Sequence, residues 1–481
     1  MGYDGAPTSA RKWRSYGECV NKLARPHEGV KMYVSVRRGG MSDTQKLDID
    51  RIRTQDFDHV WHPMMQHEGM TKDDLLVIVS GDGCEVTDAD GKTYLDTYAG
   101  IWNVNVGYGR QEIIDAVHKQ MQELPFYPQT QISVPAARLA GRLAELLPGD
   151  LNHFFFVNSG SEANETAIKV ARQYGRSTHP GENRYKIICR YQGYHGFTMG
   201  AMSATGQTGR RSLYEPLAPG FVHVEPPSGK AHGPDEIAKV IEREGPETVA
   251  AVLAEPIIGG GGVLVPPDDY LPGLREVCDH YGCLLMLDEV ITGFGRTGKM
   301  FGCEHWGVVP DVMTIAKGIS SGYLPLGACC VSDKVFDAFR AEGNEFSQVS
   351  TYGGHPTCCA AALANLDILT RERLWENSEE VGSHLLSRLD EMSSSPLVKE
   401  VRGKGLMLAV ELQNEDGTEL DAARTGRFAK ALRSAGVIVG KMSHVQAGSE
   451  PVFTLSPPLI LEAEQADRIA AAFATALREI S

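Results

Sequence analysis

Two charged residues in the middle of the chain stand where buried strands would end, and they could act together on one small molecule. Asp288 ends the apolar run LLMLD, and Lys317 directly follows the apolar run VMTIA later in the chain. A carboxylate or an amine at the end of a buried strand is costly unless it has a partner of opposite charge or a ligand. Open α/β sheets bind ligands at the carboxyl ends of their strands. Asp288 and Lys317 therefore form either a buried ion pair or part of a ligand site.

The segment FFFVNSGSEANETAIKVAR, residues 154–172, has the pattern of a strand, a turn and a helix. Its turn offers the hydroxyls of Ser159 and Ser161 together with the backbone N–H groups of Gly160, Ser161 and Glu162. Free N–H groups and the dipole at a helix N-terminus favour a phosphate. The alternative is a serine that caps the helix together with the nearby glutamate.

A flat aromatic side chain follows another apolar run, in YKIICRYQGYHG. Tyr194, next to His195, could stack on a ring-shaped ligand or pack into the protein core. The segments together offer a phosphate cradle, an aromatic surface, a carboxylate and a lysine. Pyridoxal 5'-phosphate (PLP) uses all four, since its phosphate needs an anchor, its ring a stacking surface, its pyridine nitrogen a carboxylate and its aldehyde a lysine. The combination predicts a PLP site.

The stretch GFGRTGK, residues 293–299, matches a dinucleotide fingerprint and nearly matches a phosphate loop. A dinucleotide fold needs a long helix after the glycines, but the next residues contain two more glycines and Pro310. A phosphate loop needs Ser or Thr after the lysine, and position 300 is Met. We therefore expect a tight turn here rather than a nucleotide site.

The elements around these residues alternate in the way of a doubly wound α/β fold. Residues 75–100 alternate apolar and polar residues between Gly and Asp turns, which predicts short antiparallel strands. From about residue 110, helical patterns alternate with short apolar runs of the buried-strand type, which predicts a mainly parallel sheet. We expect a large PLP-binding domain at 110–369 and a smaller α/β domain built from both chain ends, 48–109 and 370–481.

Composition narrows the class of protein further. The net charge of −15 argues against nucleic-acid or membrane-surface binding, and no apolar run approaches the length of a membrane span. The ten cysteines show no metal-ligand spacing, so we expect reduced, buried thiols, no metal and a cytoplasmic location. Residues 1–47 are expected to be a flexible extension. An upstream start codon, with Met41 as the natural beginning, is equally compatible with this stretch, and a transit peptide is the alternative.

The motifs, in this order, are similar to those of the class III, fold type I, PLP-dependent aminotransferases. The similarity extends from about residue 51 to residue 480 and is carried by NSGSEANETAIK, YHG, LLMLDEVITGFGRTG, TIAKG and TYGGHP. The resemblance implies a homodimer, or a tetramer, with shared active sites. It assigns Lys317 as the Schiff-base lysine and Asp288 as the partner of the pyridine nitrogen. It also assigns further cofactor-binding positions, namely Ser159, Gly160, Ser161, Tyr194, His195, Glu255, Val290 and, toward the neighbouring subunit, Thr351.

The resemblance also implies a reaction. A freed Lys317 amine would move a proton between substrate and cofactor, and the kinetics would be ping-pong through pyridoxamine phosphate. Ornithine and 4-aminobutyrate aminotransferases carry Arg, Glu and Gln where this chain has Thr454, Gly260 and Ile291. The segments GIWNVNVGYGR and AEPIIGGGGVLVPP look closer to ω-amino acid:pyruvate, and most of all to taurine:pyruvate, aminotransferases. We therefore expect a short ω-amino acid, sulfonate or primary amine as donor and pyruvate as acceptor.

The residues that would bind this substrate are less defined. Trp102 is expected to line the amine pocket, or else to pack in the core. The arginine that many ω-transaminases use for a carboxylate would fall near Gly440, so Lys441 and Arg402 are the candidate anion partners, with a structural salt bridge as the alternative for Arg402. Other open alternatives are a diamine or 4-aminobutyrate aminotransferase, an aminomutase of the same fold, a nucleotide-binding protein, and a regulatory relative without turnover.

Overall fold

The computed structural model describes residues 48–227, 232–442 and 451–481. The extension predicted at residues 1–47 lies outside the described residues. The chain divides into two units, the first ending at Val77 and the second spanning Ile78–Ser481. The described part of the first unit contains helix α2 (Ile49–His59), which begins where the Asp48 carboxylate accepts a hydrogen bond from the backbone N–H of Arg51 at 3.0 Å.

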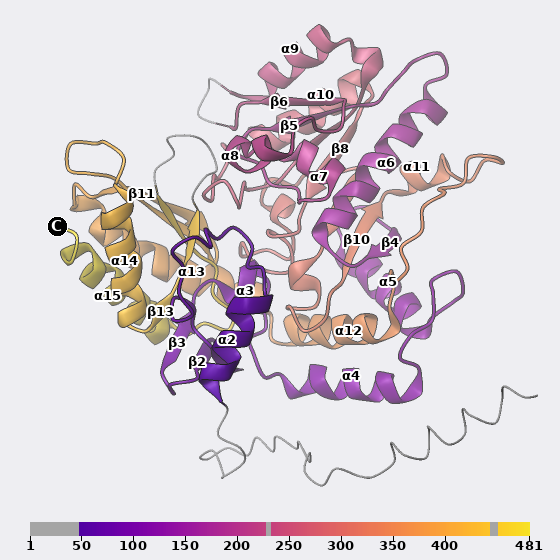
Figure 1. The fold of residues 1–481 in the computed structure, drawn as a ribbon. Coiled ribbons are helices and arrows are strands. Elements are labelled where there is room, and N and C mark those ends of the chain that lie inside the picture. Colours follow the sequence, from indigo (N-terminus) through magenta and orange to yellow (C-terminus); the bar gives the residue numbers. More distant parts are fainter. Residues whose placement is uncertain (1–47, 228–231, 443–450) are drawn as a thin grey trace, which may run out of the picture. The chain divides into compact units, whose positions relative to one another are not determined.

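A seven-stranded sheet forms the centre of the second unit (Figure 1). Its strand order is β4-β10-β9-β8-β7-β5-β6, and only β10 runs antiparallel to its neighbours. The bounds are β4 His153–Val157, β5 Lys186–Arg190, β6 Phe221–Val224, β7 Val249–Ala254, β8 Leu284–Asp288, β9 Val312–Ile315 and β10 Gly327–Val331. The mainly parallel sheet predicted from the apolar runs is confirmed.

Both faces of this sheet are covered, because successive side chains of a strand point to opposite faces. On β8, Met286 packs in a cluster with the buried face of α6 (Gly160–Thr178). Leu285 and Leu287 belong to the larger cluster on the other face. That cluster contains residues of α5 (Val134–Leu146), α9 (Pro234–Glu244), α10 (Tyr270–Tyr281) and α12 (Pro356–Arg371). A sheet with helices on both faces is the doubly wound arrangement that the sequence predicts.

Two four-stranded sheets complete the unit. One has the order β1-β2-β3-β13 and the other β11-β12-β15-β14. In the first sheet, β13 from the C-terminal part pairs in parallel with β3 from the N-terminal part, so the two chain ends share one sheet. The bounds are β1 Ile78–Asp82, β2 Glu85–Asp88, β3 Thr93–Asp96, β11 Val398–Lys404, β12 Met407–Leu412, β13 Val437–Ile438, β14 Gly440–Met442 and β15 Val452–Leu455. This pairing supports the small domain predicted from both chain ends, whose boundaries stay a prediction.

The remaining helices connect or cover these sheets. Their bounds are α3 Ala99–Trp102, α4 Gln111–Glu123, α7 Met199–Ala204, α8 Thr208–Arg211, α11 Asp333–Asp337, α13 Leu374–Asp390, α14 Ala422–Ser434 and α15 Ala463–Arg478. Single 3₁₀ turns occur at Ser212–Tyr214, Pro246–Thr248, Gly302–Trp306, Lys317–Ile319 and Glu391–Ser394. None of the helices in the described ranges is long and apolar enough to cross a membrane. The nine cysteines in these ranges are buried free thiols, as predicted.

The GFGRTGK stretch after β8 is a series of turns, and no long helix follows it. Its Arg296 is fully buried and donates to the carbonyls of Leu406 and Pro457 and to Oδ1 of Asn105. A Cβ on Gly298 would lie 2.0 Å from Oε2 of Glu379. The motif therefore joins distant parts of the unit by close packing, which explains its glycines without a nucleotide.

Candidate active site

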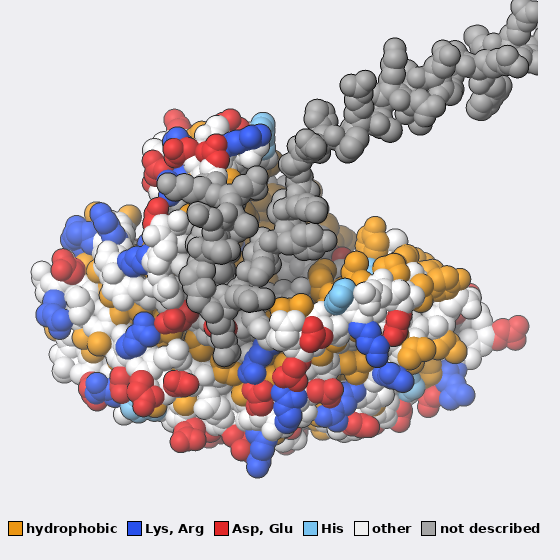
Figure 2. Space-filling model, turned by 90° about the horizontal axis from the view of Figure 1, so that it is seen from below, with side chains coloured by type: hydrophobic (Ala, Val, Ile, Leu, Met, Phe, Trp, Pro, Cys, Tyr) orange, Lys and Arg blue, Asp and Glu red, His pale blue; other side chains and the backbone are white. Residues whose placement is uncertain are grey.

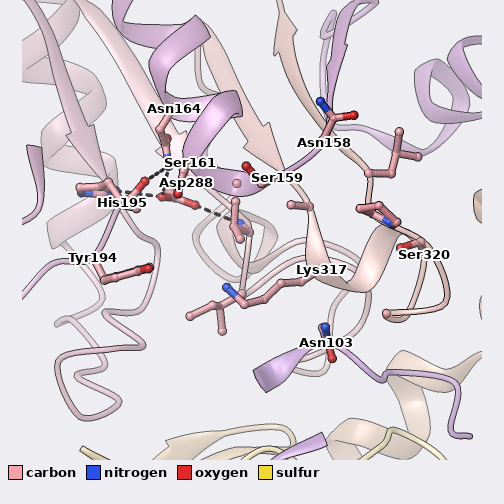
Figure 3. Close-up of a pocket in the computed structure, with 18 of the residues that line it drawn as sticks. Asn103, Asn158, Ser159, Ser161, Asn164, Tyr194, His195, Asp288, Lys317 and Ser320 are labelled. Carbon is pink, nitrogen blue, oxygen red and sulfur yellow. Dashed lines mark hydrogen bonds and ion pairs between the residues drawn. The ribbon is translucent and has the colours of Figure 1, made fainter. Parts of the chain in front are cut away.

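A cavity of about 380 Å³ opens at the carboxyl edge of the central sheet (Figure 3). Asp288 ends β8, Glu255 follows β7, and Lys317 comes two residues after the end of β9. These three side chains meet in the cavity because parallel strands place their carboxyl ends at one edge. The other predicted cofactor residues that line it are Ser159, Gly160, Ser161, Tyr194, His195 and Val290.

Asp288 is the most tightly held residue of the cavity. Its Oδ2 accepts hydrogen bonds from Nδ2 of Asn164 at 2.8 Å and pairs with Nδ1 of His195 at 2.8 Å, while its Oδ1 accepts from the backbone N–H of Val290 at 3.1 Å. The side chain is almost completely buried. Among the described residues, its only ion-pair partner is His195. Asp288 is therefore a fixed, buried acceptor that still has room for a cation.

Asn164 fixes this carboxylate from the helix α6. Its Nδ2 also donates to the carbonyl of His195 at 2.8 Å, and its Oδ1 accepts from the hydroxyl of Thr314 at 3.0 Å. Because all three bonds are buried, the position of Asp288 depends on Asn164. The sequence analysis missed this residue, although it lies in the NSGSEANETAIK motif. The only signal was its place on the buried face of the predicted helix.

Lys317 extends into the same cavity, from a backbone with φ of +43°. Burial lowers the pKa of the Lys317 amine, while the nearby carboxylates of Asp288 and Glu255 act in the opposite direction. An amine with a lowered pKa is neutral in a larger fraction of molecules, and the neutral form is the nucleophile and the base. The environment of Lys317 thus suits covalent and proton-transfer chemistry.

The turn before α6 has the features of both alternatives from the sequence, a serine N-cap and a helix N-terminus that could bind a phosphate. Ser159 is the N-cap, and its Oγ accepts from the backbone N–H of Glu162 at 3.2 Å. Gly160 leaves no space for a side chain, because a Cβ there would lie 2.9 Å from Cγ1 of Val290. Ser161 is equally confined, since a Cβ on Gly196 would lie 2.3 Å from its Oγ. The backbone N–H groups of Gly160 and Ser161 stand at the start of α6, where no carbonyl of the helix can pair with them, and both residues line the cavity, as a phosphate site requires.

Glu255 and the aromatic segment are linked by hydrogen bonds. Oε1 of Glu255 accepts from the backbone N–H of Tyr194 at 2.9 Å, and its Oε2 accepts from that of Gly259 at 2.9 Å. Burial raises the pKa of the Glu255 carboxyl. The backbone N–H of His195 donates to the Thr205 hydroxyl at 2.9 Å. Tyr194 is therefore held from its backbone, which leaves its ring available beside the cavity.

These residues fit PLP. The cavity combines a helix N-terminus, a lysine and a buried carboxylate whose only ion-pair partner in the described ranges is a histidine. A pyridinium nitrogen is the cation that Asp288 lacks, and a phosphate is the anion that the turn of α6 lacks. Val290 and Tyr194 line the cavity and offer an aliphatic and an aromatic surface for a ring.

Four other predicted residues lie outside this lining. Thr351 is exposed in the loop before α12, and Lys441 is exposed on β14. Trp102 is buried in an apolar cluster that also contains Ile291, a residue of the cavity wall. Arg402 pairs with Glu400 and Glu411 at 2.7 and 2.5 Å. Two carboxylates thus neutralise Arg402, which is the structural alternative that the sequence left open. The cofactor role of Thr351 and the substrate roles of the other three residues stay predictions.

Asn103 is a cavity residue that the sequence analysis missed. It follows Trp102 directly and lines the cavity below Lys317 in the view of Figure 3. Its Oδ1 is buried and has no hydrogen-bond partner among the described residues. The chain bends sharply here, with Gly100 at φ +69° and Trp102 at φ +61°, so the sequence pattern did not reveal which side chain faces inward.

Comparison with known proteins agrees with this site. The family model of the class III aminotransferases matches residues 68–477, so the chain belongs to this family. Like the other class III aminotransferases, it is a PLP-dependent enzyme. The chain is 45% identical to the uncharacterized aminotransferase YhxA of Bacillus subtilis, over 86% of this chain and 93% of the relative.

Two further relatives are informative about the subgroup. The taurine–pyruvate aminotransferase of Bilophila wadsworthia is 40% identical, over 86% of this chain and 94% of the relative. An (S)-enantioselective omega-transaminase structure from Thermomicrobium roseum superposes with a TM-score of 0.84 at 42% identity, over 90% of this chain and 98% of that one.

Proposed function

We propose that this enzyme transfers the amino group of a short ω-amino acid or primary amine, of the taurine or β-alanine type, to pyruvate. The observation that carries the proposal is the packing at Thr454, where the ornithine and 4-aminobutyrate aminotransferases have arginine, and at Gly440, near which many ω-transaminases have the arginine that binds a carboxylate. A Cβ on Gly440 would lie 2.3 Å from Oγ1 of Thr454 and 2.6 Å from the ring of Tyr98. Neither position can hold a long cationic side chain without rearrangement, which argues against an acceptor with a second carboxylate.

The loop after β7 also supports the subgroup of ω-amino acid:pyruvate aminotransferases. Gly260 stands where the ornithine and 4-aminobutyrate aminotransferases have glutamate. A Cβ at Gly260 would lie 3.0 Å from Nε2 of Gln207 and 3.1 Å from Cβ of Tyr194. The similarity to a taurine–pyruvate aminotransferase points the same way.

The residues of the cavity have distinct tasks in this reaction. When bound, PLP supplies an aldehyde that takes up the amine and a ring that accepts electrons. Asp288 holds a proton at the pyridine nitrogen, since its carboxylate is fixed by Asn164, His195 and the Val290 N–H. The Lys317 amine takes the proton from the substrate carbon that bears the amino group, a task that its lowered pKa favours.

We also propose that the enzyme is a cytoplasmic homodimer or tetramer. Exposed apolar side chains on two neighbouring loops around Thr351 support an interface, since large exposed apolar surfaces mark contact sites. The loops touch through Phe126 and Tyr352, whose ring centroids are 5.7 Å apart. The exposed apolar residues are Leu124, Tyr127, Ile132, Val134, Val349 and Tyr352. Figure 2 shows hydrophobic side chains gathered on part of one face.

A panel of amines with two acceptors tests the proposal. Taurine, β-alanine, 4-aminobutyrate, ornithine, putrescine and 1-phenylethylamine are each incubated with pyruvate or with 2-oxoglutarate, and alanine or glutamate is quantified. We expect alanine from taurine or β-alanine and little glutamate from any donor. Ornithine or 4-aminobutyrate with 2-oxoglutarate as the best pair would contradict the proposal. Conversion of many equivalents of amine per enzyme in the absence of any acceptor would favour the aminomutase.

A further inference from the structure

An unpaired cation stands beside the aromatic wall of the cavity. Arg210 is in the last turn of the short helix α8 and is only partly accessible to solvent. Its Nε is buried without a hydrogen-bond partner, and its guanidinium makes no ion pair with any carboxylate in the described part of the chain. A partly buried guanidinium without a nearby anion is less stable than a paired one, so a counter-charge or an anionic ligand would stabilise it.

The surroundings of Arg210 connect it to the cavity. Its backbone N–H donates to the carbonyl of Gln207 at 3.0 Å, and the Gln207 side chain borders Tyr194 at Gly260. Burial lowers the pKa of Arg210, and the titratable side chains that oppose this effect are the phenols of Tyr194 and Tyr98 rather than carboxylates. Tyr194 lines the cavity, and Tyr98 packs against Gly440 and against Trp102, with ring centroids 6.4 Å apart. Arg210 thus lies near two aromatic residues, one of which lines the cavity.

The other cations near this region have partners or face away. Arg211 donates to the carbonyl of Thr205 at 3.1 Å and to the ring of His223 at 3.0 Å. Arg402 is neutralised by two carboxylates, and Lys441 is exposed. Of these four cations, Arg210 is therefore the one that is partly buried and whose charge has no partner in the described part of the chain.

We propose that Arg210 binds the acidic group, a carboxylate or sulfonate, of the substrate, and so determines the preference for acid-bearing substrates. This inference rests on the proposed function, because it assumes that an ω-amino acid occupies the cavity. Arg210 would take the place of the arginine that has no room at Gly440 or Thr454. The guanidinium fork suits both acid groups, since each presents two or three oxygens on one atom.

The test compares Arg210→Gln and Arg210→Lys with the native holoenzyme, and Arg427→Gln serves as the matched control. Arg427 is exposed on α14. Single-turnover rates are measured against concentration for taurine and β-alanine, which carry an acid, and for 1-phenylethylamine, which does not. We expect the apparent dissociation constants of taurine and β-alanine to rise roughly 10- to 100-fold in Arg210→Gln, with partial recovery in Arg210→Lys. The value for 1-phenylethylamine should change less than about threefold, as should all values for Arg427→Gln.

A second measurement reads binding without turnover. Calorimetric titration with ethanesulfonate and with propionate, which carry the acid but no amine, should show weaker binding to Arg210→Gln by the same factor. Equal losses for acid-bearing and neutral amines would overturn the proposal in favour of a structural role, and unchanged binding of all ligands would overturn it as well. If the native enzyme converts neither taurine nor β-alanine, the proposed function fails, and the calorimetric comparison still decides whether Arg210 binds an acid.

Discussion

Replacement of Asp288 by asparagine should separate the charge of this residue from its shape. The two side chains have the same size, but the carboxylate accepts at both oxygens, from Asn164 and His195 on one and from the Val290 N–H on the other. In either orientation, the amide NH₂ of Asp288→Asn would lie opposite another hydrogen-bond donor, where the native oxygen accepts a bond. An unsatisfied buried donor costs about 1–3 kcal/mol, so the variant should fold with reduced stability.

The larger effect should be on the reaction. The ring nitrogen of the cofactor loses its anionic partner, and removal of one partner of a buried ion pair costs roughly 3–5 kcal/mol. At about 1.4 kcal/mol for each factor of ten, this corresponds to a roughly 100- to 5,000-fold slower proton transfer. Stopped-flow absorbance after mixing the PLP-saturated variant with an amine measures this rate, and circular dichroism checks the fold.

A neighbouring aspartate provides the control. Asp311 is also buried, but it lies away from the cavity lining, where it pairs with Arg275 at 2.8 Å and accepts from the Leu285 N–H at 2.8 Å. Asp311→Asn should lower stability yet leave the single-turnover rate within about threefold. A folded Asp288→Asn enzyme that retains more than about a tenth of the native rate would refute the assignment of Asp288 to the pyridine nitrogen.

Three further predictions concern packing and stability. Gly160→Ala places a methyl group 2.9 Å from Cγ1 of Val290, so PLP should bind more weakly by about 1–3 kcal/mol in equilibrium titrations, and Val290→Ala in the same chain should restore part of the loss. No recovery in the double variant would show that the clash is not the cause. Burial and the nearby Arg211 lower the pKa of His223 from 6.5 to about 4, so the unfolded chain takes up this proton first as the pH falls. The free energy of unfolding should therefore lose about 2–3 kcal/mol between pH 6.5 and pH 4 through this residue alone, and denaturant titrations of His223→Gln should show a correspondingly flatter profile. An identical pH profile would exclude His223 as a source of acid sensitivity. Arg296→Met should lower stability by about 3–5 kcal/mol because three buried acceptors lose their donor, and a midpoint of unfolding unchanged from the native protein would contradict the linking role of the GFGRTGK turn.

The cofactor residues could be predicted because the sequence places them at the ends of apolar runs. Asp288 and Lys317 end or follow two parallel strands, so one sheet edge brings them together regardless of the details of packing. Glu255, which only the family resemblance assigned, follows a third parallel strand at the same edge. Ser159 and Gly160 follow from the strand–turn–helix pattern in the same way.

The substrate side of the cavity depends on contacts that no local pattern contains. Gly440 meets Thr454 through the pairing of β14 with β15, and Gly440 also meets Tyr98 from the N-terminal part of the chain. Asn103 faces inward because the chain bends sharply at Gly100. Arg210 is notable only because no carboxylate in the described part of the chain pairs with it. Such features arise from tertiary packing, and the substrate roles of Trp102, Lys441 and Arg402 stay predictions.

A half-reaction spectrum tests the central claim most directly. The purified holoenzyme is mixed with taurine or β-alanine in the absence of any keto acid, and the visible absorbance of the lysine-bound cofactor is followed. We predict that one of these amines removes the absorbance, that pyruvate restores it while 2-oxoglutarate does not, and that Lys317→Ala never shows it. Absorbance that neither ω-amino acid changes, or that 2-oxoglutarate restores as well as pyruvate does, would contradict the proposal of an ω-amino acid:pyruvate aminotransferase.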